Sequence, residues 1–108
     1  MTAGLAPAEP ATAAELVAFQ PGAVVSREVM RSAKGTVTAF AFDEGQGLSE
    51  HTTPYDALAH VLEGEAEITI GGTPHRVSGG QVVLMPGGVP HALRAAARFK
   101  MILTMIRA

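Results

Sequence analysis

From residue 23 onward, short apolar runs of three to eight residues alternate with turns rich in glycine and proline. The runs are rich in Val, Ile, Thr, Phe and Met, residues that favour strands. They predict strands over residues 23–30, 36–42, 56–62, 66–70, 75–77, 82–85, 91–95 and 99–106. Many short strands with no helix between them are typical of a sandwich or barrel, and not of a parallel α/β sheet.

The alternation of side chains along residues 56–70 predicts which face of the strands is buried. Neighbouring side chains of a strand point to opposite sides of the sheet, so every second residue shares a face. The even positions hold apolar residues and one histidine: Leu58, His60, Leu62, Ala66, Ile68 and Ile70. We therefore predict that His60 points into the core. Glycines in the segments 62–65 and 70–73 predict two tight hairpins.

The first residues have a different character. Residues 1–11 are rich in Ala and Pro and are predicted to be loosely held. Residues 12–19 predict one short helix, in which Thr12 is the N-cap and Glu15 completes a capping box. The rest of the chain, residues 12–108, is expected to form a single domain.

Composition narrows the possible functions. With 47% hydrophobic and 17% charged residues, the chain can bury a core. The net charge of −2 is spread without a basic run, so we expect no nucleic-acid partner. No apolar segment reaches the ~18 residues of a membrane span, so we expect no membrane partner and a cytoplasmic location. Because cysteine is absent, His and carboxylate are the only strong metal ligands available.

Two segments resemble a known family. "GLSEHTTPYDALAHVLEGEAEITIGG" and "GGQVVLMPGGVPHALRA" resemble the two-motif core of small, RmlC-like, single-domain cupins, over roughly residues 35–106. The second motif is matched at four positions: Gly80, Pro86, Gly88 and His91. The first motif is matched by His51 and Gly64, with Thr53 in place of its second histidine and Ala57 or Leu58 in place of its glutamate.

The resemblance implies an all-β double-stranded β-helix, the jelly-roll barrel of the cupins, here with a short N-terminal helix. It also implies one metal or small-molecule site in the barrel mouth, and assembly as a dimer. Of the ligand positions of the family, this sequence keeps His51 and His91. We expect a homodimer that buries part of residues 23–42, since sheet edges need cover.

A metal ion in the mouth needs a third ligand, because divalent sites normally use three or more N or O donors. His60 is the first candidate, and Asp56 offers a carboxylate if the turn after Pro54 folds inward. His60 is otherwise a core histidine. Three imidazoles would suit a divalent transition metal such as Zn, Ni, Fe, Mn or Cu. His75, beside a hairpin, is given no role.

The candidate ligand pocket combines hydroxyl groups and apolar side chains near the mouth: Thr53, Tyr55, Leu58, Phe40 and Met101. We therefore predict a metal-binding small cupin that binds or acts on a small organic molecule. If it is an enzyme, oxidation by O₂, isomerisation and lyase chemistry are the plausible reactions. Two competing hypotheses remain: a metal-free barrel that binds a small ligand, and a purely structural dimeric barrel.

Overall fold

The computed structural model describes residues 4–107, and these form the all-β barrel that the sequence predicts. The elements are η1 (Ala13–Glu15), β1 (Val24–Ser32), β2 (Gly35–Phe42), β3 (Gly47–His51), β4 (Asp56–Glu63), β5 (Glu65–Ile70), β6 (Thr73–Ser78), β7 (Val82–Met85), β8 (His91–Ala95) and β9 (Phe99–Ile106). The ranges predicted for β7, β8 and β9 agree with the structure at both ends.

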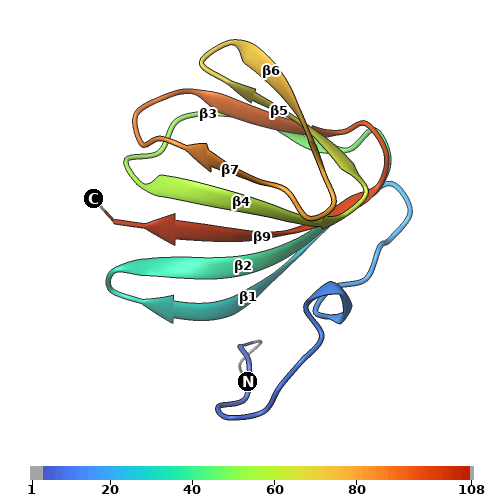
Figure 1. Cartoon of the computed structure of the whole chain (residues 1–108), viewed down its shortest axis with the longest axis vertical. Coiled ribbons are helices and arrows are strands. Elements are labelled where there is room, and N and C mark those ends of the chain that lie inside the picture. The colour runs from blue at the N-terminus through green and yellow to red at the C-terminus, as the bar shows by residue number, and fades with distance from the viewer. Residues whose placement is uncertain (1–3, 108) are drawn as a thin grey trace.

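The strands form two sheets that face each other across the core (Figure 1). The five-stranded sheet has the order β1-β2-β9-β4-β7, and the four-stranded sheet has the order β3-β8-β5-β6. All neighbouring strands are antiparallel. This arrangement of two antiparallel sheets is that of a jelly roll.

One strand, β3, was not predicted. Its sequence, GLSEH, contains a single apolar residue, Leu48, so it lacks the pattern of a buried strand. It forms by pairing with β8, and Leu48 packs against the main core. The consequence matters for function, because His51 lies at the end of a paired strand and not in a free loop.

The predicted N-terminal helix is reduced to the three-residue 3₁₀ turn η1, and Thr12 makes no side-chain capping bond. Side chains of the barrel take the carbonyl groups that an α-helix would use. Lys100 Nζ donates to Ala14 O at 2.6 Å, and Arg27 Nη1 donates to Leu16 O at 3.3 Å. Since isolated short helices are marginal in water, these tertiary bonds decide the local structure.

Most of the segment 1–11 that was predicted to be loosely held is described, but residues 1–3 lie outside the described residues. Leu5 N donates to Val29 O at 3.0 Å, which places this segment beside β1. Further along, Leu16, Val17 and Phe19 pack against Ala39 and neighbouring residues on the outer side of the five-stranded sheet. No helix within residues 4–107 is long and apolar enough to cross a bilayer.

The inner face of the five-stranded sheet is built in rows that run across the strands. At one end of the barrel the rings of Phe42 and Phe99 stack with centroids 4.5 Å apart, and both are fully buried. At the other end, Arg31 pairs with Thr36, Thr36 with Met105, and Met105 with Ala57. The interior therefore changes from aromatic at one end to polar at the other.

The face predicted for β4 is wrong. Ala57, Ala59 and Val61 are the buried residues of this strand, whereas Leu58 and His60 are exposed on the outer side of the sheet. Long side chains from β2 and β9, strands of the same sheet, already fill the interior beside β4, among them Phe42 and Met101. Small side chains on β4 complete this packing, because protein interiors are filled to crystal-like density.

The face predicted for β5 is right: Ala66 and Ile68 are fully buried. The buried parity changes between the two strands because β4 carries a register shift between Val61 and Glu63, and the chain then turns at Gly64. Gly64 has φ +83°, and a Cβ there would collide with the Arg98 carbonyl oxygen, so glycine is required. Residues 62–65 form a corner between the two sheets, and the hairpin predicted there is wrong.

The second hairpin is confirmed, because β5 and β6 pair up to Ile70 and Thr73 on either side of two glycines. Gly71 and Gly72 both have positive φ, as tight two-residue turns require.

Candidate functional site in the barrel mouth

The polar end of the barrel, which we call the mouth, is formed by five connections. They are the β1–β2 turn, the chain after β9, the β5–β6 hairpin, the β3–β4 connection and the β7–β8 connection (Figure 1). The last two are tied together: Gly88 N donates to Thr53 O at 2.8 Å, and Gly87 N donates to Asp56 Oδ1 at 2.8 Å. These bonds fix the rim of the mouth around the end of β3 and the start of β8.

His51 and His91 lie together at this rim. They are direct cross-strand partners on β3 and β8, and their ring centroids are 4.3 Å apart at an interplanar angle of 69°. His91 is 4% exposed and follows the inward parity of Leu93 and Ala95, whereas His51 is exposed. The two histidines predicted for the mouth are thus brought into contact.

The hydrogen bonds of the two rings fix which nitrogen is available. His51 Nδ1 lies 2.8 Å from Ser49 O, and His91 Nδ1 lies 3.3 Å from Val89 O. A carbonyl oxygen only accepts, so each Nδ1 donates and carries the hydrogen. In the neutral rings, both Nε2 atoms are then left with a lone pair for a ligand. A second ring nitrogen held in this way is usual for histidines that bind metals.

Burial in the barrel lowers the pKa of His91 below its ordinary value, because the charged ring loses water contact. The hydrogen bond to Val89 O opposes this shift, and the nearby His51 ring adds to it. The neutral form of His91 is therefore favoured near neutral pH. That form keeps an unprotonated Nε2, which both metal binding and hydrogen-bond acceptance require.

The other predicted ligands do not join the pair. His60 lies on the outer face of β4, beside Val82 and Ile102 on the neighbouring strands, so the three-histidine site does not form. His75 is exposed on the edge strand β6. Asp56 is exposed, and its Oδ1 holds Gly87 N of the β7–β8 connection.

The donor set does not complete a divalent metal site from protein groups alone. Within residues 4–107, no three His, Asp or Glu side chains are grouped so as to hold an ion. Thr53, at the position of the family's second histidine, accepts a hydrogen bond from Tyr55 N at 3.2 Å. At the position of the family's glutamate, the inward residue is Ala57, with Leu58 pointing outward. Two imidazoles are fewer than the three donors that divalent sites normally use.

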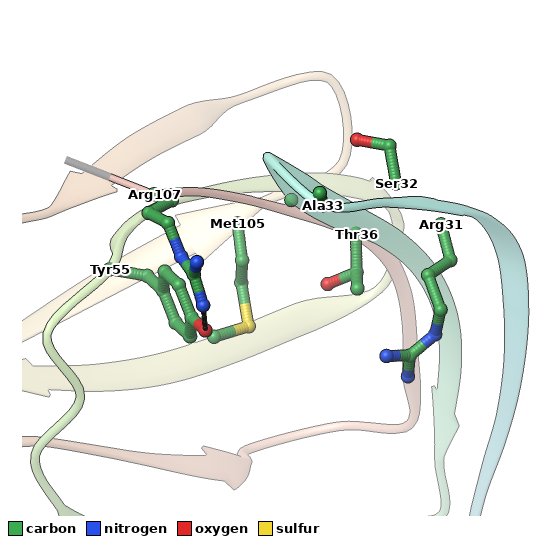
Figure 2. A pocket seen from close by; sticks show the side chains of 8 residues that line it. Arg31, Ser32, Ala33, Thr36, Tyr55, Met105 and Arg107 are labelled. Atoms are coloured by element: carbon green, nitrogen blue, oxygen red, sulfur yellow. Dashed lines mark hydrogen bonds between the residues drawn. The ribbon is translucent and has the colours of Figure 1, made fainter.

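A cavity of about 530 Å³ opens at the mouth between the β1–β2 turn, the end of β9 and the β3–β4 connection. Its lining includes Tyr55, one of the predicted pocket residues, together with Arg31, Thr36, Met105 and Arg107 (Figure 2). The volume is within the range of about 300–1,000 Å³ that is typical of small-molecule sites.

The other predicted pocket residues do not line this cavity. Leu58 is 40% exposed on the outer face, Met101 is fully buried in the core, and Phe40 packs against that core beside Phe42. Thr53 lies in the connection before Tyr55. Of the predicted pocket residues, only Tyr55 lines the cavity. The apolar ones lie in the core or on the outer surface.

Sequence reasoning missed Arg107, Arg31, Thr36 and Met105. A signal was present: Arg107 directly follows the last apolar strand, and Arg31 and Thr36 flank the β1–β2 turn. In an antiparallel barrel, alternate strand ends meet at one rim, so charged and hydroxyl residues at those ends share the mouth with His51. The register needed to use this signal comes from the structure.

The chain is similar to several known proteins. Residues 39–107 match the cupin domain of the Cupin_2 family. A conserved protein of unknown function from Streptococcus pyogenes, SPY1581, is 34% identical with a TM-score of 0.91, over 96% of this chain and 91% of that one. A cupin superfamily protein from Desulfitobacterium hafniense is 27% identical with a TM-score of 0.90, over 96% and 95%.

A cupin 2 conserved barrel domain protein from Leptotrichia buccalis is also similar, with 34% identity and a TM-score of 0.84 over 87% of this chain and 46% of that one. No curated protein sequence matches the chain. The matched domain spans most of the barrel, including both mouth histidines. Fold, motif positions and family match agree, and the chain belongs to the Cupin_2 family of cupin barrels.

Proposed function

We propose that this cupin is a binding barrel for a small organic molecule, held in the mouth by hydrogen bonds to His51 and His91. The observation that carries the proposal is the histidine pair itself. Both Nδ1 atoms are tied to carbonyl oxygens, and both Nε2 atoms are left as acceptors. Two acceptors fixed by the backbone are a prepared site for a ligand that carries a hydroxyl or another donor. The cavity at the mouth is lined by other residues, Tyr55 and Arg107 among them.

Burial supports this role. His91 is almost fully enclosed, so a donor that reaches its Nε2 is shielded from water. Its lowered pKa keeps the ring neutral and accepting. His51 is exposed and can contact the ligand from the solvent side of the mouth.

The proposal is tested by NMR of the four histidine rings in ¹⁵N-labelled protein, titrated with a library of small polyols and hydroxy acids. We expect the free protein to show the Nδ1–H tautomer for His51 and His91. Compounds that bind should shift the ring nitrogens of these two residues and leave those of His60 and His75 unchanged, which makes the latter two the internal controls. A library without effect on either mouth histidine would exclude the binding role.

A metal-binding role is the second proposal, because the Nδ1 contacts orient the free Nε2 atoms as they do in metal-bound histidines. In that case the ion's remaining positions would be filled by water or by the bound molecule, since the protein supplies two strong donors. Elemental analysis of protein purified without a metal-affinity column separates the proposals. One ion per chain would favour the metal site, and protein free of metal after incubation with Zn²⁺ or Ni²⁺ would exclude it.

A further inference from the structure

The cavity at the mouth has an uneven charge distribution. Two arginines contribute to its lining, Arg31 and Arg107. Arg31 is neutralised by Glu28: its Nε lies 2.9 Å from Oε1, and its Nη2 lies 2.6 Å from Oε2. Among the ion pairs of residues 4–107, none includes Arg107. Within residues 4–107, the cavity lining therefore holds one arginine, Arg107, that has no carboxylate side chain as a partner.

Arg107 is held in place by a neutral group. Its Nη2 donates to the Tyr55 hydroxyl oxygen at 3.3 Å, and its guanidinium carbon lies 5.8 Å from the centre of the Tyr55 ring. Figure 2 shows both groups at one side of the cavity, with Met105 next to them and Thr36 between Met105 and Arg31. Because the Tyr55 oxygen accepts this bond, its own hydrogen remains to donate. A guanidinium and a hydroxyl donor thus lie next to each other.

We propose that this cavity binds the carboxylate end of a small organic monoanion, with Arg107 and Tyr55 as its donors. The proposal rests on the proposed binding function and names the chemical class of the ligand. A planar guanidinium fork matches a carboxylate and can donate two parallel hydrogen bonds to its oxygens. One arginine without a carboxylate partner suits a monoanion better than a phosphate dianion, because Arg31, the other arginine of the lining, is already paired with Glu28.

The remaining cavity wall fits an organic body attached to that carboxylate. Met105 offers an adaptable apolar surface, and Thr36, its direct cross-strand partner on β2, offers a hydroxyl. Both belong to the inner-face row that continues through Ala57 to Met85, and Ala57 is the inward residue of the two at the motif's glutamate position. Ala57 thus offers no acidic side chain at this position, and among the described residues Arg107 has no carboxylate partner at the rim. Together these features favour an acid as ligand over a base.

Tyr55 makes the test direct, because it is the only tyrosine and the chain has no tryptophan. Its fluorescence therefore reports on this cavity alone. We would titrate the protein with butanoate and hexanoate, and with butanamide and hexanamide as neutral analogues of the same shape. We expect a saturable change in emission with the acids and none with the amides. Inorganic phosphate should bind more weakly than either acid.

The matched variants are Arg107→Gln and Arg76→Gln. Arg107→Gln should weaken acid binding about tenfold or more, since a charge-assisted hydrogen bond is lost. Arg76 is exposed and paired with Glu65 on the other sheet, so Arg76→Gln should leave affinity unchanged. Circular dichroism checks that both variants fold.

Equal response to acids and amides, unchanged acid affinity in Arg107→Gln, tighter binding of phosphate, or no response to any compound would each overturn the carboxylate assignment. The proposed binding function fails separately, since its readout is the ring nitrogens of His51 and His91. If neutral polyols shift the ring nitrogens of the two histidines while acids leave Tyr55 emission unchanged, the binding function is supported and the carboxylate ligand is contradicted.

Discussion

The strands β4 and β5 follow each other in the chain, yet their patterns carry different information. In β5, the residues alternate between buried and partly exposed, with Glu65 and Glu67 on the outside. In β4, both faces carry apolar residues: Ala57 and Ala59 inside, Leu58 outside. Alternation therefore identifies the inner face of β5, whereas on β4 it points to the larger leucines and gives the wrong face.

The difference comes from what covers each sheet. The outer face of the four-stranded sheet is charged, with ion pairs between Arg76 and Glu65 and between Arg94 and Glu67. The outer face of the five-stranded sheet is apolar and exposes several large side chains: Met30, Leu58, Val82, Leu84 and Ile106. A sheet with one face in water shows clean alternation, and one with two apolar faces does not.

The comparison also explains the misplacement of His60. It was assigned to the interior because it shares the parity of two leucines, and both Leu58 and His60 prove to be on the outer face. Ala57 and Ala59 are small, so they are weaker hydrophobic signals than Leu58, yet they are the residues that fit against the interior side chains of β9. Burial on β4 therefore follows the space available in the interior and not the size of the side chain.

The largest expected effect comes from placing a charge on the inner face of β4 and comparing it with a charge on the outer face. Ala59→Asp should abolish folding, because a carboxylate would be buried without a partner where Ala59 is 0% exposed. Leu58→Asp should remain folded, since that side chain lies on the outer face and reaches water. Circular dichroism and urea unfolding of both variants measure this. If Leu58→Asp were the less stable variant, Leu58 would be the buried residue, as the sequence pattern predicts.

The second effect concerns metal uptake by the histidines of the two faces. His91→Leu should weaken the apparent affinity for Zn²⁺ about tenfold or more, since it removes one of the two paired donors. His60→Leu should match the wild type, as should His75→Leu, because neither ring lies with the pair. Competition against a chromophoric chelator gives the affinities. A loss of affinity in His60→Leu would mean that His60 does reach the ion.

A third prediction concerns the apolar outer face. We expect a homodimer that buries part of residues 23–42, within which Met30 is 60% exposed, together with Leu58 and Leu84 next to each other on β4 and β7. Contiguous apolar patches of this kind mark interaction surfaces. Leu84→Glu should weaken the dimer about tenfold or more, as expected for a charge placed at an apolar interface.

Light scattering over a range of micromolar concentrations measures this dimer. Thr69→Glu is the control, because Thr69 lies on the outer face of the four-stranded sheet and should not change the mass. A monomer mass for the wild-type protein at these concentrations would argue against the interface.

The smallest effect expected is the pH dependence contributed by His91. Its pKa is lower in the folded barrel than the ordinary 6.5, so the unfolded chain binds the proton more readily. The stabilisation is therefore fully present above that ordinary pKa, and it is lost as the pH falls toward the folded-state pKa. Urea unfolding at about pH 7.5 and about pH 5.5 should show a smaller acid-induced loss in His91→Gln than in the wild type. An equal loss in both would mean that His91 titrates as it does in the unfolded chain.

Much of the fold follows from the sequence alone. Short β-rich runs between glycine turns determine most strands and their limits, as β7, β8 and β9 show. The two motifs determine the family and the placing of His51 and His91, because the glycines and prolines around His91 fix the turns on which a barrel rim depends. Local backbone preferences carry this information, and they do not need the rest of the molecule.

The tertiary structure alone decided the rest. β3 exists because β8 pairs with it, η1 is short because Lys100 and Arg27 bind its carbonyl groups, and β4 presents its alanines because the interior is already filled. The pairing of Tyr55 with Arg107 joins residues 52 positions apart. Each of these depends on which side chains meet across the barrel, and a single strand's pattern cannot specify its neighbours' volume or charge.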